Sequence, residues 1–269
     1  MSQTRNSYED KQVSVIKNWM NEEPGVVSQT FGFIAKPLTS VVQAVIPEAA
    51  IIAVLNGANS MGEFLADESD ILRDGNVSKI EDLRNKDLKI SDELANSVHN
   101  WAIALAAGEG GVAGATGVVG IAADIPTILT LALRTIHKIG LCYGYRANNK
   151  AERDFVLTVL SAAGANSQIE KIRALATLKA IEVIIQKQSW KNIEKKIAEY
   201  MGKETAIKAI KTLAKQLGIN FSKRKALQAI PLMGAGIGAA VNADFMRDVG
   251  YAAIHSYQRR WLDDKDKWN

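Results

Sequence analysis

The chain has few of the residues that form disulfides, break helices or commonly act in catalysis. It contains one cysteine, Cys142, five prolines and three histidines in 269 residues. A lone cysteine cannot form a disulfide within the chain and is typical of a reducing compartment. Few prolines leave long segments free to form helices. Alternating β-branched runs bounded by Asn-Gly or Asp-Gly turns are missing, which disfavours a sheet. We therefore expect an all-α protein that is made and kept in the cytoplasm, where it can also bind to the inner face of the membrane.

Motifs for common catalytic chemistry are also absent. The sequence has no Walker loop, HExxH, GxSxG or CxxC motif, so it does not indicate nucleotide hydrolysis, zinc proteolysis, serine hydrolysis or thiol exchange. The three histidines, His99, His137 and His255, are too scattered to specify a metal site by their spacing. We expect no metal and no cofactor. Whether the protein is an enzyme stays open, with the balance against catalysis.

Helix-forming residues dominate the rest of the chain. No Gly/Ser-rich or Pro-rich linker divides it, so we expect a single-domain multi-helix bundle with two long Gly/Ala-rich central helices. Residues 1–25 would form an N-terminal arm or helix, 26–262 the helical domain and 263–269 a polar tail. Two capping boxes are expected, at Ser78/Glu81 and at Ser167/Glu170. Together with the apolar periodicity, they predict the following segments: 7–21, 41–45, 49–55, a short helix after Ser78, 92–107, a glycine-rich stretch 112–145, 151–163, 167–188, 191–200, 204–217 and 231–261.

Two of these segments resemble each other. A glycine lies four residues before Asp124 and another lies four residues before Asn242. A histidine follows each polar residue after thirteen positions, His137 in the first segment and His255 in the second. One explanation is that small residues at helical spacing allow two long helices to pack closely. The glycines concerned are Gly114, Gly117, Gly120, Gly234 and Gly238.

The other explanation is a duplicated helix pair whose polar residues face one pocket. A buried carboxylate without a partner is costly, so Asp124 needs one, and the neighbouring Pro126 suggests a kinked or newly started helix. Acid–base chemistry by Asp124, His137, Asn242 and His255 is then conceivable. On one straight helix, however, Asp124 and His137 would lie on different faces. Cys142 is better explained as a small buried hydrophobe than as a reactive thiol.

The sequence resembles the EcsC family in the order of several small motifs. The resemblance covers residues 30–260 and includes Lys36-Pro37 and Ile46-Pro47, a Gly110-Gly111-x-x-Gly114-x-x-Gly117-x-x-Gly120 run, Ala123-Asp124-Ile125-Pro126, Leu131 to Arg134, Tyr143-Gly144, and Ile230-Pro231-x-x-Gly234 through Asn242 to Ala252-Ala253.

The family takes its name from a protein that is encoded beside the two components of an ABC transporter. The resemblance implies a helical, membrane-associated protein of bacterial origin, with an ABC transporter or secretion component as a partner. It carries no catalytic residues over to this chain.

The charge is strongly polarised along the chain. Residues 171–225 contain fourteen Lys or Arg and four Glu, which gives +10; the whole chain carries +4, so the remainder carries −6. Such polarity can orient a protein on a phosphate-bearing surface. An ordinary solvated face is the alternative, and without interleaved exposed aromatics we expect no nucleic-acid partner. The candidate membrane or phosphate contacts are Lys191, Lys195, Lys196, Lys208, Lys211, Lys215, Lys223, Arg224 and Lys225.

One segment, 112–133, is long enough to cross a bilayer. Asp124 lies near its middle, where a charge costs roughly 2.5–3.5 kcal/mol, so a buried helix is the better interpretation.

Three hypotheses about function follow. The first is a peripheral membrane protein that acts through lipid or a membrane-protein complex. The second is a small-molecule-binding protein or hydrolase-type enzyme with a pocket near Asp124 and Asn242. The third is a membrane-perturbing effector whose glycine-rich helices leave the core. Nothing in the sequence fixes the oligomeric state.

Overall fold

The computed structural model describes residues 4–24, 55, 57, 67–115, 117–186, 212, 216, 220 and 234–268. These residues form helices and no strand, so the all-α prediction is confirmed for them. The elements are α1 (Ser7–Asn21), α5 (Ser69–Asp74), the 3₁₀ helix η1 (Ile80–Asn85), α6 (Leu88–Ala115), α7 (Gly117–Cys142), α8 (Lys150–Ala163), α9 (Gln168–Gln186) and α12 (Gly234–Asp264).

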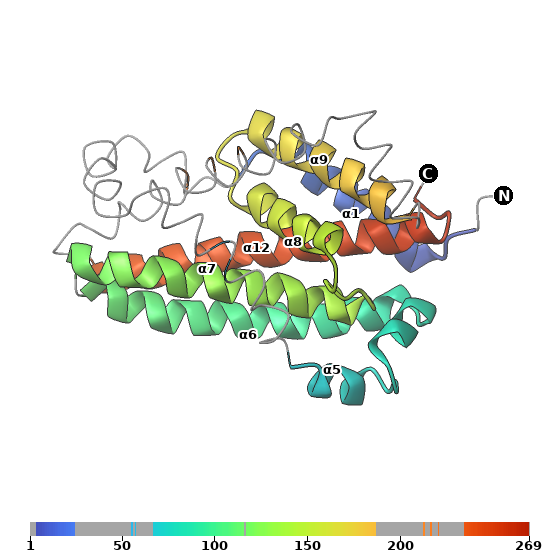
Figure 1. Cartoon of the computed structure of the whole chain (residues 1–269), viewed down its shortest axis with the longest axis horizontal. Helices are drawn as coiled ribbons and strands as arrows, with labels where there is room; N and C mark the ends of the chain where they lie inside the picture. Colours follow the sequence, from blue (N-terminus) through green and yellow to red (C-terminus); the bar gives the residue numbers. More distant parts are fainter. Residues whose placement is uncertain are drawn as a thin grey trace.

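Three long helices form the frame of the molecule. Helices α6, α7 and α12 are 28, 26 and 31 residues long and lie side by side, with α12 packed most extensively along α6. Helices α7 and α12 run in the same direction, and α6 runs against both (Figure 1). The two Gly/Ala-rich helices expected at the centre are therefore present, and α6 is a third helix of similar length.

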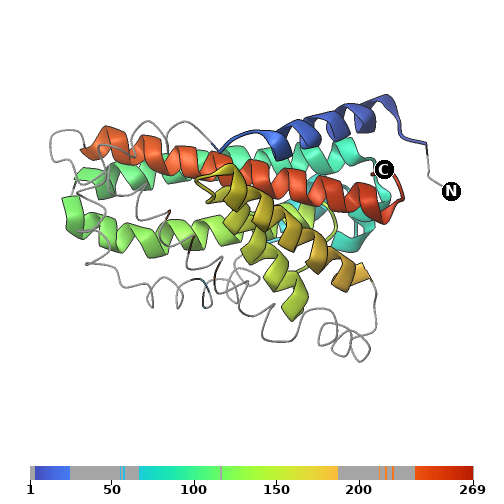
Figure 2. The ribbon, with the colours of Figure 1, turned by 90° about the horizontal axis from the view of Figure 1, so that it is seen from above.

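A second group of helices covers the other side of α12. Helices α8 and α9 pack on each other, and α8 packs on α12. Helix α1 lies beside the C-terminal half of α12 and also contacts α9 (Figure 2). Helix α12 is thus central, which explains why its C-terminal half is buried almost all round.

The predicted end of α6 was wrong. The sequence indicated a helix over 92–107 followed by a glycine-rich break, but α6 continues through this run to Ala115. Glycine costs only about 1 kcal/mol per residue in a helix interior, and packing against α7 and α12 outweighs that cost. Pro126 likewise does not open a helix, because α7 begins nine residues before it, at Gly117.

The predicted caps fared differently. Ser167 accepts a hydrogen bond from the backbone N–H of Glu170 (3.3 Å) and precedes α9 as expected. Gly164 follows the last residue of α8, also as expected. At the short helix, by contrast, the backbone N–H of Lys79 donates to Asp82 (3.2 Å), so the cap lies one residue after the predicted Ser78/Glu81 pair. The helices expected at 41–45, 49–55, 191–200 and 204–217 lie outside the described residues, apart from single positions.

Two glycines allow α12 to approach its neighbours closely. A Cβ atom on Gly250 would lie 2.0 Å from Cδ2 of His99, on α6. A Cβ atom on Gly140, in α7, would lie 2.7 Å from the hydroxyl oxygen of Tyr257. Both separations are far below van der Waals contact, so rings of His99 and Tyr257 occupy the space that a side chain would need.

This packing predicts opposite effects for two Gly→Ala changes in long helices. Gly250→Ala should lower the free energy of unfolding by about 1–3 kcal/mol, because the new methyl group overpacks against His99. Gly108→Ala, where nothing lies within 4 Å of the added Cβ, should raise it by up to about 1 kcal/mol through helix propensity. Urea unfolding of the two variants measures both. Equal effects would show that the close approach at Gly250 is wrong.

Candidate functional site

The C-terminal half of α12 carries a run of buried polar residues. Arg260 forms a bidentate ion pair with Glu152 of α8, at 2.7 and 2.6 Å, and both side chains are almost fully buried. The Arg260 guanidinium lies over the ring of Tyr145, 4.0 Å from its centroid. Tyr257 packs one turn earlier against Tyr143, Tyr145 and Phe155. A desolvated, fully bonded pair in such a setting fixes the position of α8 on α12.

A buried carboxylate lies near the start of α6. Asp92 accepts hydrogen bonds from the hydroxyls of Tyr8 (2.7 Å) and Tyr143 (2.5 Å), and Gln258 also faces it. Burial raises the pKa of Asp92, although these donors stabilise its charged form and act against the shift. This one side chain therefore connects α1, α6, the end of α7 and α12.

Four rings from three helices form a continuous column. His99 of α6 meets Tyr251 of α12 edge-on, with ring centroids 5.1 Å apart. Tyr251 stacks on His255 (6.0 Å), and His255 packs against Trp19 of α1 (5.2 Å). The Nδ1–H of His255 donates to Oε1 of Gln258 (2.9 Å). The column links the α6–α12 contact at Gly250 to the end of α1.

Burial disfavours the charged form of both histidines in the column. Burial lowers the pKa of His99, whose Nε2 makes no hydrogen bond although backbone groups of Met246 and Arg247 lie near and act the other way. Burial also lowers the pKa of His255, and the positive charge of Lys171 adds to this shift. Gln258 and Glu22 oppose the shift of His255.

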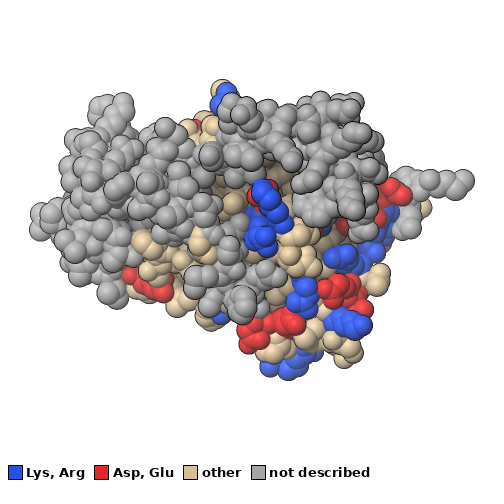
Figure 3. Space-filling view, viewed as in Figure 1, with Lys and Arg blue, Asp and Glu red and all other residues tan. Residues whose placement is uncertain are grey.

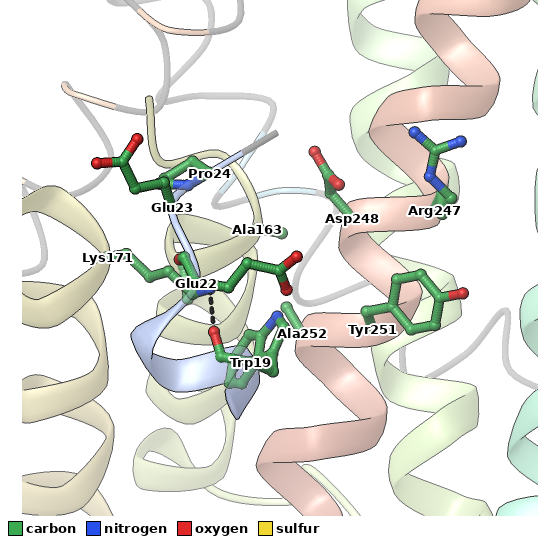
Figure 4. Close-up of a pocket in the computed structure, with 11 residues that line it drawn as sticks. Trp19, Glu22, Glu23, Pro24, Ala163, Lys171, Arg247, Asp248, Tyr251 and Ala252 are labelled. Atoms are coloured by element: carbon green, nitrogen blue, oxygen red, sulfur yellow. Dashed lines mark hydrogen bonds between the residues drawn. The ribbon is translucent and has the colours of Figure 1, made fainter. Parts of the chain in front are cut away.

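A cavity of about 240 Å³ lies beside the column. It is bounded by the end of α1, α8, α9 and α12, and the carboxylate of Glu22 extends across it towards α12 (Figure 4). Lys171 is buried in its wall and donates to the backbone carbonyls of Trp19 and Glu22, the latter at 3.0 Å. The cavity is lined by alanines and by side chains of both charges. This mixture does not indicate one class of ligand. Its members are Trp19, Glu22, Glu23, Pro24, Ala162, Ala163, Lys171, Arg247, Asp248, Tyr251 and Ala252.

The structure separates the four residues of the predicted pocket into two levels. Asp124 and His137 lie on the continuous helix α7, and Asn242 and His255 lie on α12. Thirteen residues of α-helix span about 20 Å, so the four cannot share one small site. His137, Asn242 and His255 are buried. The side chain of Asp124 lies outside the described atoms.

The internal similarity nevertheless corresponds to matching heights on the two helices. Gly140 meets Tyr257, which follows it by 117 residues, and each similar pair in the sequence is separated by 118. Helices α7 and α12 run in the same direction, so His137 and His255 lie at nearly the same level. The ring contacts described for His255 are with Trp19 and Tyr251.

The remaining predicted site residues are only partly covered. The candidate packing glycines Gly114, Gly117, Gly120, Gly234 and Gly238 all lie within α6, α7 and α12. The nine basic candidates, Lys191 to Lys225, lie outside the described residues. Among the residues that are described, no group of three or more His, Cys, Asp or Glu side chains could hold a metal ion. None of the described helices has the length and hydropathy needed to cross a membrane.

An exposed apolar stripe follows the first turns of α9. Ile169 and Ile172 are 63% and 54% exposed, the two highest values for large apolar side chains in the described part of the chain. Arg173 and Ala176 are also exposed and continue the same face at helical spacing. The sequence analysis missed this stripe, although Ile169, Ile172 and Ala176 at i, i+3 and i+7 were its visible signal. Asp92, Trp19 and Lys171 were missed as well, since their partners lie far away in the sequence.

The fold defines a class of protein: a helical bundle whose central helix carries buried polar residues along its C-terminal half. A family model described as the EcsC protein family matches residues 10–262, and the chain belongs to this family. It is 28% identical over 206 residues to the uncharacterized protein YdbA of Bacillus subtilis (strain 168), covering 74% of this chain and 71% of that protein. No solved structure matches the chain.

The buried ion pair gives the second prediction. Arg260→Met should lower the free energy of unfolding by about 3–5 kcal/mol, because it leaves the Glu152 carboxylate buried without its partner. Combining it with Glu152→Gln should recover part of the loss. As a matched control, Arg146→Met removes the more exposed ion pairs with Glu68 and Glu81 and should cost only about 0–1 kcal/mol for each pair. Urea unfolding of all three variants would contradict this assignment if the two arginine changes cost the same.

Proposed function

We propose that the protein attaches to the anionic surface of a lipid bilayer as a peripheral protein and acts there through lipid or through a membrane-protein complex. The exposed stripe on α9 carries this proposal. Two isoleucines at i and i+3, each more than half exposed, stand beside Arg173 on the same helix. Apolar side chains flanked by basic ones are typical of helices that lie in the bilayer interface.

The charge distribution along the sequence also supports attachment to an anionic surface. Helix α9 leads into the segment that contains the nine basic candidates, and the net charge of residues 171–225 is +10. Each Lys or Arg near an anionic surface contributes on the order of 1 kcal/mol. Around α5 and η1, by contrast, charges of both signs are interspersed (Figure 3) and paired, as in Arg146 with Glu68 and Lys138 with Asp70. An anionic surface would find little net attraction there.

A second candidate function rests on the cavity at the end of α1. A space of about 240 Å³ bounded by four helices, with Trp19 and several charged groups in its wall, would suit a small ligand. The small-molecule hypothesis is therefore kept, but the proposed binding site moves. It lies one to three turns of α12 beyond Asn242, on the C-terminal side. An ABC transporter or secretion component stays a proposed protein partner, suggested by the family context alone.

The membrane proposal predicts the outcome of co-sedimentation with liposomes. Binding to anionic vesicles should weaken as salt increases, and charge reversal at Lys208, Lys211 and Lys215 should abolish it. Replacing Ile169 and Ile172 together with Ser should weaken it at least about tenfold, because their burial in the interface is lost. Trp101→Ser, which removes another exposed apolar side chain but on α6, is the matched control and should leave binding unchanged.

Two results would contradict the proposal. Wild-type protein that fails to bind anionic vesicles at low salt would remove the membrane from consideration. Binding that survives both sets of substitutions would place the contact elsewhere on the molecule.

A further inference from the structure

Helix α1 is held on the bundle by a small apolar contact and by several polar ones. Only two of its apolar side chains, Val13 and Ile16, are fully buried, together with the carboxylate residue Glu9. Helix α8, which is one residue shorter, buries Phe155, Val156, Val159 and Leu160 among others. Apolar burial is the main stabilising contribution in folding, so α1 has the weaker hydrophobic attachment of the two.

The polar contacts of α1 fall into two groups. Near its start, Tyr8 donates to Asp92 (2.7 Å), and the ammonium of Lys267 donates to both oxygens of Glu9 (2.7 and 2.9 Å). In the next turn, Gln258 donates to Oε1 of Gln12 (3.3 Å).

At the end of α1, backbone carbonyls of its last turn and of the following residue Glu22 accept hydrogen bonds from α9. Lys171 donates to Trp19 and Glu22, and Gln168 donates to Met20 (3.4 Å) and Asn21 (3.2 Å). Side chains of the first turn of α9 therefore cap α1.

His255 connects the two groups. Its ring packs against Trp19, the last aromatic residue of α1, and its Nδ1–H is bonded to Gln258, which in turn contacts Gln12. The groups that face it come from each neighbouring element: Trp19 and Glu22 from α1, Lys171 from α9, His99 from α6, and Tyr251 and Gln258 from α12. Of these, Lys171 opposes a positive charge on the ring and Glu22 favours it.

We infer that α1 is a latch on the bundle that opens when His255 is protonated. In the docked state the ring is 8% exposed and sits near the Lys171 ammonium, so the imidazolium is disfavoured there. Once α1 leaves, the ring is hydrated and its pKa returns towards the ordinary value of about 6.5. The undocked state then binds protons more strongly, and by linkage acid shifts the equilibrium towards it. This inference does not rest on the proposed membrane contact.

Opening would also change the cavity beside the column. Trp19 of α1 and the residues that follow the helix, Glu22, Glu23 and Pro24, form one side of its wall, so undocking would remove that side. Asp92 titrates in the opposite sense, because burial raises its pKa in the docked state and its protonation favours docking. An acid-induced release of α1 is therefore assigned to His255.

Hydrogen–deuterium exchange of the full chain at pH 7.5, 6.5 and 5.5, corrected for the intrinsic effect of pH on exchange, tests the latch. Residues 7–21 report on α1, and residues 95–106 of α6 serve as the internal reference. Opening of α1 should increase up to about tenfold for each unit by which the pKa of His255 rises on undocking, while the α6 segment stays protected. In H255Q, which keeps a hydrogen-bonding side chain that does not titrate, opening should no longer increase as the pH falls, because Asp92 favours docking in acid.

Each other result overturns the inference. Protection of α1 that is unchanged down to pH 5.5, or lost together with that of α6, excludes a local latch. An equal loss in H255Q assigns the effect to another group. Should H255Q fail to fold, NMR titration of the three histidines in the wild type decides, with H99Q and H137Q for assignment: a His255 pKa at or above about 6.5 sinks the proposal.

Discussion

The contact of α12 with α6 at Gly250 fixes the geometry of the region around the candidate site. Because Gly250 has no Cβ, the His99 ring lies directly against the α12 backbone. That ring positions Tyr251, Tyr251 stacks on His255, and His255 reaches Trp19 of α1. A shift of one helix relative to the other would move every ring of the column, since close-packed interiors deform little. The cavity beside the column depends on the same contact, because Tyr251 and Trp19 both line it.

Polar side chains of α12 also contact each of the outer helices α1, α8 and α9. His255 and Gln258 contact α1, Arg259 faces Glu182 of α9 (3.6 Å), and Arg260 binds Glu152 of α8. Hydrophobic contacts are non-directional, so a helix buried on all sides could accept its neighbours in several rotations. A bonded charge or amide accepts only one partner at low energy. We therefore regard this polar run as the element that selects one arrangement of the outer helices.

The helices could be predicted from the sequence, whereas their partnerships could not. Spacing and caps were sufficient for α8 and for the start of α9, because those signals are local. The end of α6 was missed, since helix propensity is weak and distant packing outweighs it. The pairing of Asp92 with Tyr8 and Tyr143, and of His255 with Trp19, joins residues from separate elements. No local pattern encodes such contacts. The similarity of α7 to α12 could not tell which side chains converge.

The arrangement also places helix α1, which has few buried apolar side chains, beside the exposed apolar stripe of α9. Gln168 and Lys171 hold the end of α1, and they alternate along α9 with the exposed Ile169 and Ile172. Side chains of consecutive residues on a helix point about 100° away from each other. A single turn of α9 can therefore bind α1 on one side and expose its isoleucines to solvent on the other. Undocking of α1 would release the Lys171 ammonium from two carbonyls on that same turn. The proposed latch and the exposed stripe therefore share one turn of α9.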